Sequence, residues 1–184
     1  MLLLAEALAV VALIAFALAC LVLVRRAAAV LADARETESF RRAVADLAAR
    51  IQATLDSVVA PIDGVRRHSV AAETIVEGLE AASASLAAYA DEAKAIRGPE
   101  RAAEIREAIL LELDRAARAL QMVEHGCGIL GSVGVGGREL EAQTSIKRGY
   151  LNILHAREAL ARHSARAAAL GALEERRLFA RRNI

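Results

Sequence analysis

The first 24 residues place the strongest constraint on this chain. Leu2 to Val24 form an apolar run interrupted only by Glu6, and the run ends at Arg25 and Arg26. As an α-helix with a rise of about 1.5 Å per residue, this run would be about 34 Å long, enough to cross the roughly 30 Å hydrocarbon core of a bilayer. The sequence therefore predicts one transmembrane helix, with residues 1–26 acting as an anchor.

Two processing signals fit this run less well than an anchor does. A cleaved secretory signal has basic residues before an apolar core of about 7–15 residues, whereas the residues up to Glu6 include no basic side chain. A lipoprotein signal ending at Cys20 lacks the same basic residues, and the chain stays apolar from Leu21 to Val24. We therefore expect the anchor to be retained.

The basic residues predict the orientation of this anchor. Cytoplasmic flanks of membrane spans carry the excess of Lys and Arg. The arginines that follow the apolar run at short range are Arg25, Arg26, Arg35, Arg41 and Arg42, and no Lys or Arg precedes it. We expect a single-pass protein of the inner (cytoplasmic) membrane, with its N-terminus outside and the bulk of the chain in the cytoplasm.

Residues 27–184 are predicted to form an all-α domain. Alanine is abundant, no alternating strand pattern of useful length occurs, and the only two prolines, Pro61 and Pro99, separate long helical patterns. The expected architecture is an elongated four-helix bundle resembling an antiparallel coiled coil. Its helices are expected at about 27–60, 62–97, 100–125 and 138–182, with a Gly-rich connector over 126–137.

Two apolar patterns support this bundle. Large apolar residues recur at steps of three or four, as expected for one face of a helix, at Phe40, Val44, Leu47, Ile51, Leu55 and Val58. A heptad pattern typical of a coiled-coil seam follows at Val65, His68, Ala72, Ile75, Leu79, Ala82, Leu86, Tyr89, Ala93 and Ile96. In this pattern His68 is expected to be a core histidine, and Val59 to Gly64 is expected to form a turn.

The number of helices predicts where the C-terminal segment lies. If the first helix of the bundle leads away from the membrane, the fourth returns toward it. Juxtamembrane basic residues gain about 1 kcal/mol each near an anionic lipid surface. The residues expected to contact this surface are Arg25, Arg26, Arg176, Arg177, Arg181 and Arg182.

The Gly-rich segment 126–137 is the main compositional anomaly after the apolar run. Gly126, Gly128 and Gly131 match the spacing of a dinucleotide fingerprint, but that motif functions between a strand and a helix, and a helix precedes it here. A flexible connector is the simplest interpretation, and a docking loop for a partner is the alternative. The residues expected to dock a partner are Cys127, Ile129, Leu130, Val133 and Val135.

No motif predicts catalysis, a metal site or a cofactor. None of the four histidines, His68, His125, His155 and His163, has a glutamate three residues before it, as di-iron bundles require. A net charge of +1 and an aromatic content of 3% argue against binding of nucleic acid. We expect no enzyme activity, no cofactor and no metal.

The sequence thus favours a membrane-anchored scaffold, adaptor or assembly protein. Its partners are expected to be membrane lipid, further copies of the chain, and other membrane or cytoplasmic proteins, because a core built from small alanines favours additional packing. One alternative is a sensor or signal-relay module with a ligand site near Cys127. A second alternative is a cofactor-binding helical bundle.

Overall fold

The computed structural model describes residues 2–132 and 137–170, and it describes side chains from Leu13 onward apart from Ala15. The long helices are α1 (Leu2–Arg66), α2 (Val76–Ala95), α3 (Ala103–Gly131) and α4 (Glu139–Ala169). Two short 3₁₀ helices, η1 (Ala72–Ile75) and η2 (Glu100–Ala102), precede α2 and α3. These described residues contain helices and no strands, so the all-helical prediction is confirmed.

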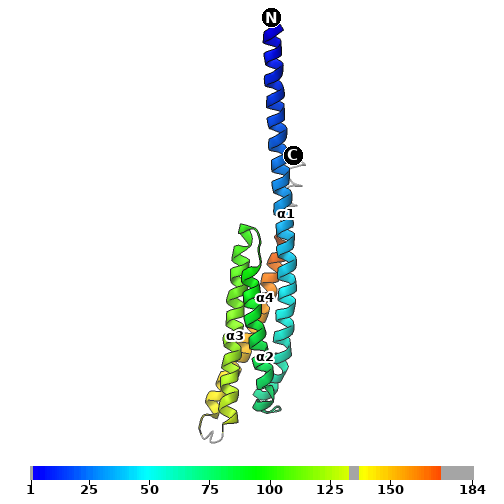
Figure 1. The fold of residues 1–184 in the computed structure, drawn as a ribbon. Coiled ribbons are helices and arrows are strands. Elements are labelled where there is room, and N and C mark those ends of the chain that lie inside the picture. Colours follow the sequence, from blue (N-terminus) through cyan, green and yellow to red (C-terminus); the bar gives the residue numbers. More distant parts are fainter. Residues whose placement is uncertain (1, 133–136, 171–184) are drawn as a thin grey trace.

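The four helices form an antiparallel bundle from which the N-terminal half of α1 projects (Figure 1). Contacts run from α1 to α2, α2 to α3, α3 to α4 and α4 back to α1, which closes the ring. Because the helices alternate in direction, the last residues of α4 lie at the end of the bundle from which α1 projects (Figure 1). The predicted return of the fourth helix to this end is therefore found.

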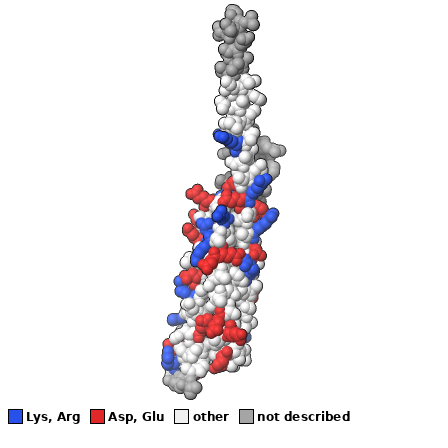
Figure 2. Space-filling view, viewed as in Figure 1, with Lys and Arg blue, Asp and Glu red and all other residues white. Residues whose placement is uncertain are grey.

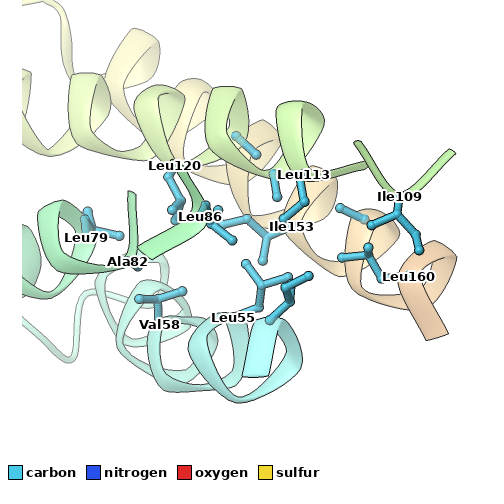
Figure 3. Close-up of a cluster of buried hydrophobic side chains, with 14 of the residues drawn as sticks. Leu55, Val58, Leu79, Ala82, Leu86, Ile109, Leu113, Leu120, Ile153 and Leu160 are labelled. Atoms are coloured by element: carbon cyan, nitrogen blue, oxygen red, sulfur yellow. The ribbon is translucent and has the colours of Figure 1, made fainter. Parts of the chain in front are cut away.

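The core is built from the apolar stripes of all four helices, whose side chains converge as Figure 3 shows. The stripe predicted on α1 is buried throughout, with exposed fractions between 0 and 4% from Phe40 to Val58. On α2 the heptad residues Leu79, Ala82, Leu86 and Ala93 are also buried. Periodicity alone therefore identified the inward faces of these two helices.

Pro61 does not end the first helix, so the predicted turn at Val59 to Gly64 is wrong. The helix continues through Pro61 to Arg66. Proline inside a helix costs about 3 kcal/mol because it removes one hydrogen bond and crowds the preceding turn. Continuing the helix buries Ile62 and Val65, which are 0 and 3% exposed, and each such burial contributes about 1.5–3 kcal/mol. Burial of these two side chains offsets the proline.

The reversal comes instead at residues 67–71, where His68 occupies the left-handed region with φ of 59°. The amide of Ser69 donates to the carbonyl of Gly64 at 2.9 Å, and the amide of His68 donates to that of Val65 at 3.0 Å. This pair of bonds is the Schellman motif, which favours glycine at the position of His68. His68 is exposed, so the prediction of a core histidine is wrong.

This backbone conformation predicts that His68→Gly stabilises the bundle. Glycine adopts a positive φ without the steric penalty that a Cβ atom brings, so we expect the free energy of unfolding to rise by about 1 kcal/mol. The full chain in mild detergent can be unfolded with urea and followed by the fluorescence of Tyr89 and Tyr150, the only tyrosines in a chain without tryptophan. Gln143→Ala, which removes the 2.9 Å contact to His68 Nε2, should leave the stability unchanged.

Helix α3 also extends further than predicted, because it includes Gly126, Cys127 and Gly128 and ends at Gly131. The connector that we expected over 126–137 therefore begins only after Gly131, about six residues further along the chain than expected. Gly126 and Cys127 are buried along the same face of α3 as Leu120 and Val123. Packing against α4 outweighs the low helix propensity of glycine, which costs about 1 kcal/mol per residue.

Candidate functional site

The most distinctive surface is the part of α1 that lies beyond the bundle, here called the projecting segment (residues 2–36). Every described side chain from Leu13 to Ala32 is exposed, and Thr37 is the first buried one. No Asp, Glu, Lys or Arg occurs between Leu13 and Val24, and Figure 2 shows the corresponding uncharged surface below the grey tip.

Between Leu13 and Val24, large apolar side chains cover the projecting segment on all sides. Their exposed fractions include 72% at Leu13, 71% at Phe16 and 66% at Val24. A helix that is apolar around its whole circumference is normally covered by lipid or by other protein. The exposure of this segment therefore requires a covering that the chain itself does not provide in its described part.

The predicted transmembrane helix over 2–24 is not supported by the described residues. Among those residues, no helix has a stretch that is long and apolar enough to span a bilayer. The side chains of residues 1–12 and of Ala15, which make up about half of the predicted span, lie outside the described part.

The arginines predicted to contact the membrane surface divide into two groups. Arg25 and Arg26 are exposed on the projecting segment, immediately after the apolar run. Thr37, where the bundle begins, is twelve residues beyond Arg25, which corresponds to about 18 Å of helix. The predicted contact residues Arg176, Arg177, Arg181 and Arg182 lie outside the described residues.

The base of the projecting segment is fixed to the bundle by a polar contact that the sequence patterns did not reveal. Arg101, in η2, donates to Asp33 at 2.9 Å and to the hydroxyl of Thr37 at 2.8 Å. Beside this contact, a Cβ atom on Gly98 would overlap the ring of Phe40, so glycine lets the loop before η2 cover that ring. The projecting segment therefore continues rigidly from the bundle.

The residues predicted to dock a partner at the Gly-rich segment are split between the core and the undescribed part of the chain. Cys127 and Ile129 are 2% and 6% exposed and pack in the bundle, and Leu130 is half-buried. Val133 and Val135 lie outside the described residues. A docking surface at this end would depend on Leu130 and on residues that the structure does not describe.

Cys127 is a structural thiol in this arrangement. Burial, with smaller contributions from the nearby carboxylates Glu73 and Glu124, raises the pKa of its side chain to about 11. Since the thiolate is the nucleophilic form, Cys127 stays neutral and unreactive at physiological pH. The other cysteine, Cys20, lies exposed on the projecting segment.

The four histidines do not form a metal site within the described residues. No group of three or more His, Cys, Asp and Glu side chains comes together there. His125 lies 3.8 Å from Glu141 at the surface, and His68 contacts Gln143. A depression lined by Gly137 lies between α3 and α4 and includes His125, Glu141 and Arg148. Cys127 is not among the residues that line this depression.

His163 differs from the other histidines because its Nδ1 atom is buried without a hydrogen-bond partner among the described residues. Burial lowers its pKa below the usual 6.5, and Arg166 and Arg162 lower the pKa further, while Glu112 opposes this shift. The folded chain therefore binds a proton at His163 less readily than the unfolded chain does.

This pKa shift predicts that acid destabilises the bundle. The unfolded state gains protons at His163 as the pH falls below about 6.5, so the free energy of unfolding should decrease between pH 7 and pH 5.5. Urea unfolding at several pH values measures the decrease. His163→Gln should flatten the dependence of the free energy of unfolding on pH, whereas His125→Gln, at an exposed site, should retain it. Equal slopes in both variants would contradict the assignment of this pH dependence to His163.

Two glycines allow α3 and α4 to approach closely: Gly149, which the sequence patterns did not single out, and Gly126, which they assigned to the connector. A Cβ atom on Gly149 would lie 2.6 Å from the carbonyl oxygen of Ala119 and 2.6 Å from Val123 Cγ2. One on Gly126 would lie 2.6 Å from Ile146 Cγ1. The sequence could have indicated this contact, because Ala142, Gly149 and Ala156 follow one another at seven-residue spacing on α4. Small residues at heptad spacing lie along one line of a helix that packs against another.

Comparison with known proteins does not assign the chain to a family. No protein-family model matches the sequence, and searches of curated proteins and of solved structures find no significant match.

Proposed function

We propose that this protein is a membrane-anchored helical scaffold that acts through protein–protein contacts. In this proposal residues 2–24 lie in the bilayer as a single span, and the bundle lies on its cytoplasmic side. The observation that supports it is the projecting segment, in which an apolar helix leaves the bundle with its described large side chains exposed, from Leu13 at 72% to Val24 at 66%.

Lipid is the covering that fits this segment. Burial of a Leu, Val or Phe side chain is worth about 1.5–3 kcal/mol, so several such side chains together provide a strong driving force for insertion. Arg25 and Arg26 follow the apolar run directly, at the height where the cytoplasmic headgroups would lie. Asp33 and Arg35, further along α1, would remain in water.

A rigid spacer between membrane and bundle suits a scaffold. Residues 25–36 continue the same helix and hold the near end of the bundle about 18 Å from the headgroup level. Arg101 ties the base of this spacer to η2 through Asp33 and Thr37. The bundle would thus be presented at a fixed distance from the membrane, with α2, α3 and the distal loops facing the cytoplasm.

The interior of the bundle favours contact at surfaces over binding of a ligand within. Side chains such as Leu55, Leu86, Leu113 and Ile153 lie buried between the helices (Figure 3). The sensor alternative requires a ligand site near Cys127, and this side chain packs in that core at 2% exposed. No specific observation favours the sensor or the cofactor-binding bundle as a second candidate.

Extraction of membranes with alkaline carbonate tests the anchor. The full chain, expressed in a bacterial host, should sediment with the membranes after carbonate washing and enter the soluble phase only with detergent. A chain that lacks residues 2–24 should be released by carbonate. Release of the full chain by carbonate would refute membrane anchoring.

A further inference from the structure

The projecting segment carries an apolar seam with a coiled-coil spacing. The residues of this seam follow one another at steps of four and three, and all are exposed: Leu13, Ala17, Cys20, Val24, Ala27, Leu31 and Ala34. Its three large side chains, Leu13, Val24 and Leu31, are 72, 66 and 58% exposed. Alternating steps of four and three place residues along one line of a helix that packs against another.

The seam faces away from the bundle to which it belongs. Each residue turns an α-helix by about 100°, so residues such as Val24 and Leu31 lie on the side of α1 opposite to Phe40, Val44 and Leu47. These last three side chains are buried in the bundle, at 1, 2 and 1% exposed. The bundle of the same chain therefore does not block the seam.

Lipid does not cover the whole seam. On the proposed function, the bilayer ends near Arg25 and Arg26, and Ala27, Leu31 and Ala34 lie beyond it in water. Leu31 remains 58% exposed there. Since burial of one such side chain is worth about 1.5–3 kcal/mol, this end of the seam favours a protein partner.

We propose that the seam is a parallel interface with the α1 seam of a second copy of this chain; this inference rests on the proposed membrane anchor. Copies inserted in one orientation and to one depth place identical residues at identical heights, so the seam meets its own counterpart in register. From Leu13 to Ala34 it covers about three heptads, which reaches the minimum of three to four heptads typical of a coiled coil. A second copy thus supplies a matching apolar surface over the full length.

The face of α1 that continues the line of the seam along the bundle allows the bundles of two copies to lie side by side. Along the same side of α1, at the level of the bundle, lie the exposed small residues Ala45, Ala49, Ala53 and Ala60. Small side chains let two helices run close together. The charged side chains on this side of α1, Glu38, Arg42 and Asp56, are already paired within the chain. The bundles of a parallel pair would then lie on the outer sides of the two α1 helices.

Cysteine crosslinking of the full chain in membranes tests the interface. In a Cys20→Ser background, Ala27→Cys lies on the seam, and Ala29→Cys, two residues further along the same exposed helix, lies on the opposite side. With a short bismaleimide, we expect at least ten times more covalent dimer from Ala27→Cys than from Ala29→Cys. Cys127 should not react, because it is buried and its thiol is neutral.

A second pair of variants tests whether apolar contact holds the copies together. Leu31→Glu, on the seam, should reduce crosslinking at Ala27→Cys at least fivefold, whereas Val30→Glu, at a similarly exposed neighbouring position, should leave it intact. Equal crosslinking from both cysteines, or none, in chains that resist carbonate extraction would overturn the parallel interface alone. Chains that carbonate releases would overturn both the interface and the anchor on which it rests.

Discussion

Gly126→Ala should destabilise the bundle by about 2–3 kcal/mol, whereas Gly128→Ala, two residues further along α3, should stabilise it by about 0.5–1 kcal/mol. Alanine raises the helix propensity at both positions by a similar amount. The difference comes from the space available, because a Cβ atom on Gly126 meets Ile146 at 2.6 Å and one on Gly128 meets nothing within 4 Å.

We expect Gly149→Ala to destabilise the bundle by a similar amount. Its Cβ atom would lie 2.6 Å from the backbone oxygen of Ala119, which cannot move without shifting α3. With Gly126→Ala in the same chain, the combined loss of about 4–6 kcal/mol would approach the whole stability of a typical domain, about 5–15 kcal/mol. The two sites share one interface, so their effects need not add.

Urea unfolding of the full chain in mild detergent, followed by tyrosine fluorescence, measures these changes. Tyr89 and Tyr150 both lie in the bundle, each with an arginine over its ring at 5.3 and 5.2 Å, so the signal reports on the bundle. Effects of the same sign for Gly126→Ala and Gly128→Ala would show that α3 and α4 are not packed as closely as described.

The helices of the bundle could be predicted from the sequence to the extent that they depend on periodicity. The steps of three and four from Phe40 to Val58 identified the buried face of α1 because a helix repeats every 3.6 residues. Their order and alternating directions followed from the lengths of the patterns. The apolar periodicity and the lengths of the helical patterns depend on residues close together in the sequence, so a single sequence is enough to recognise them.

The ends of the helices could not be predicted, because contacts between helices decide them. Proline at position 61 suggested a turn, yet the burial of Ile62 and Val65 against the other helices extends α1 to Arg66, by almost two turns. Glycine at position 126 suggested a loop, yet the close approach of α4 keeps it helical. Local propensity is a weak guide where tertiary packing opposes it.

The candidate site was predictable only in part. The apolar run and its boundary at Arg25 are properties of the sequence, whereas the contact of Arg101 with Asp33 and Thr37 joins residues more than sixty positions apart. The spacing of the seam from Leu13 to Ala34 can be read from the sequence, but the side of α1 on which it lies relative to the bundle cannot. The structure shows which side of α1 is buried in the bundle, and the seam lies on the opposite side.

Two arginines in the apolar run should release the chain from the membrane. On insertion scales, an arginine at the centre of a span costs about 2.5–3.5 kcal/mol, so Leu13→Arg together with Phe16→Arg should cost about 5–7 kcal/mol. We expect most of this variant to leave the membrane fraction on carbonate extraction, while the bundle keeps its tyrosine fluorescence and its unfolding transition.

The matched control places two arginines on the same helix at the bundle. Ala45 and Ala49 are exposed, so Ala45→Arg with Ala49→Arg adds the same charge without touching the apolar run. This control should sediment with the membranes, as we expect of the unaltered chain. Retention of the Leu13→Arg and Phe16→Arg variant in the membrane would mean that this run is not what anchors the chain.

Labelling with a membrane-impermeant maleimide tests the tethered bundle most directly. In a Cys20→Ser background, Ala88→Cys provides an exposed thiol on α2 of the bundle, while Cys127 is buried. We expect no labelling of Ala88→Cys in intact bacterial cells and full labelling once the membrane is permeabilised, with the chain in the membrane fraction throughout. Labelling in intact cells, or recovery of the chain in the soluble fraction, would contradict a bundle anchored on the inner face of the membrane.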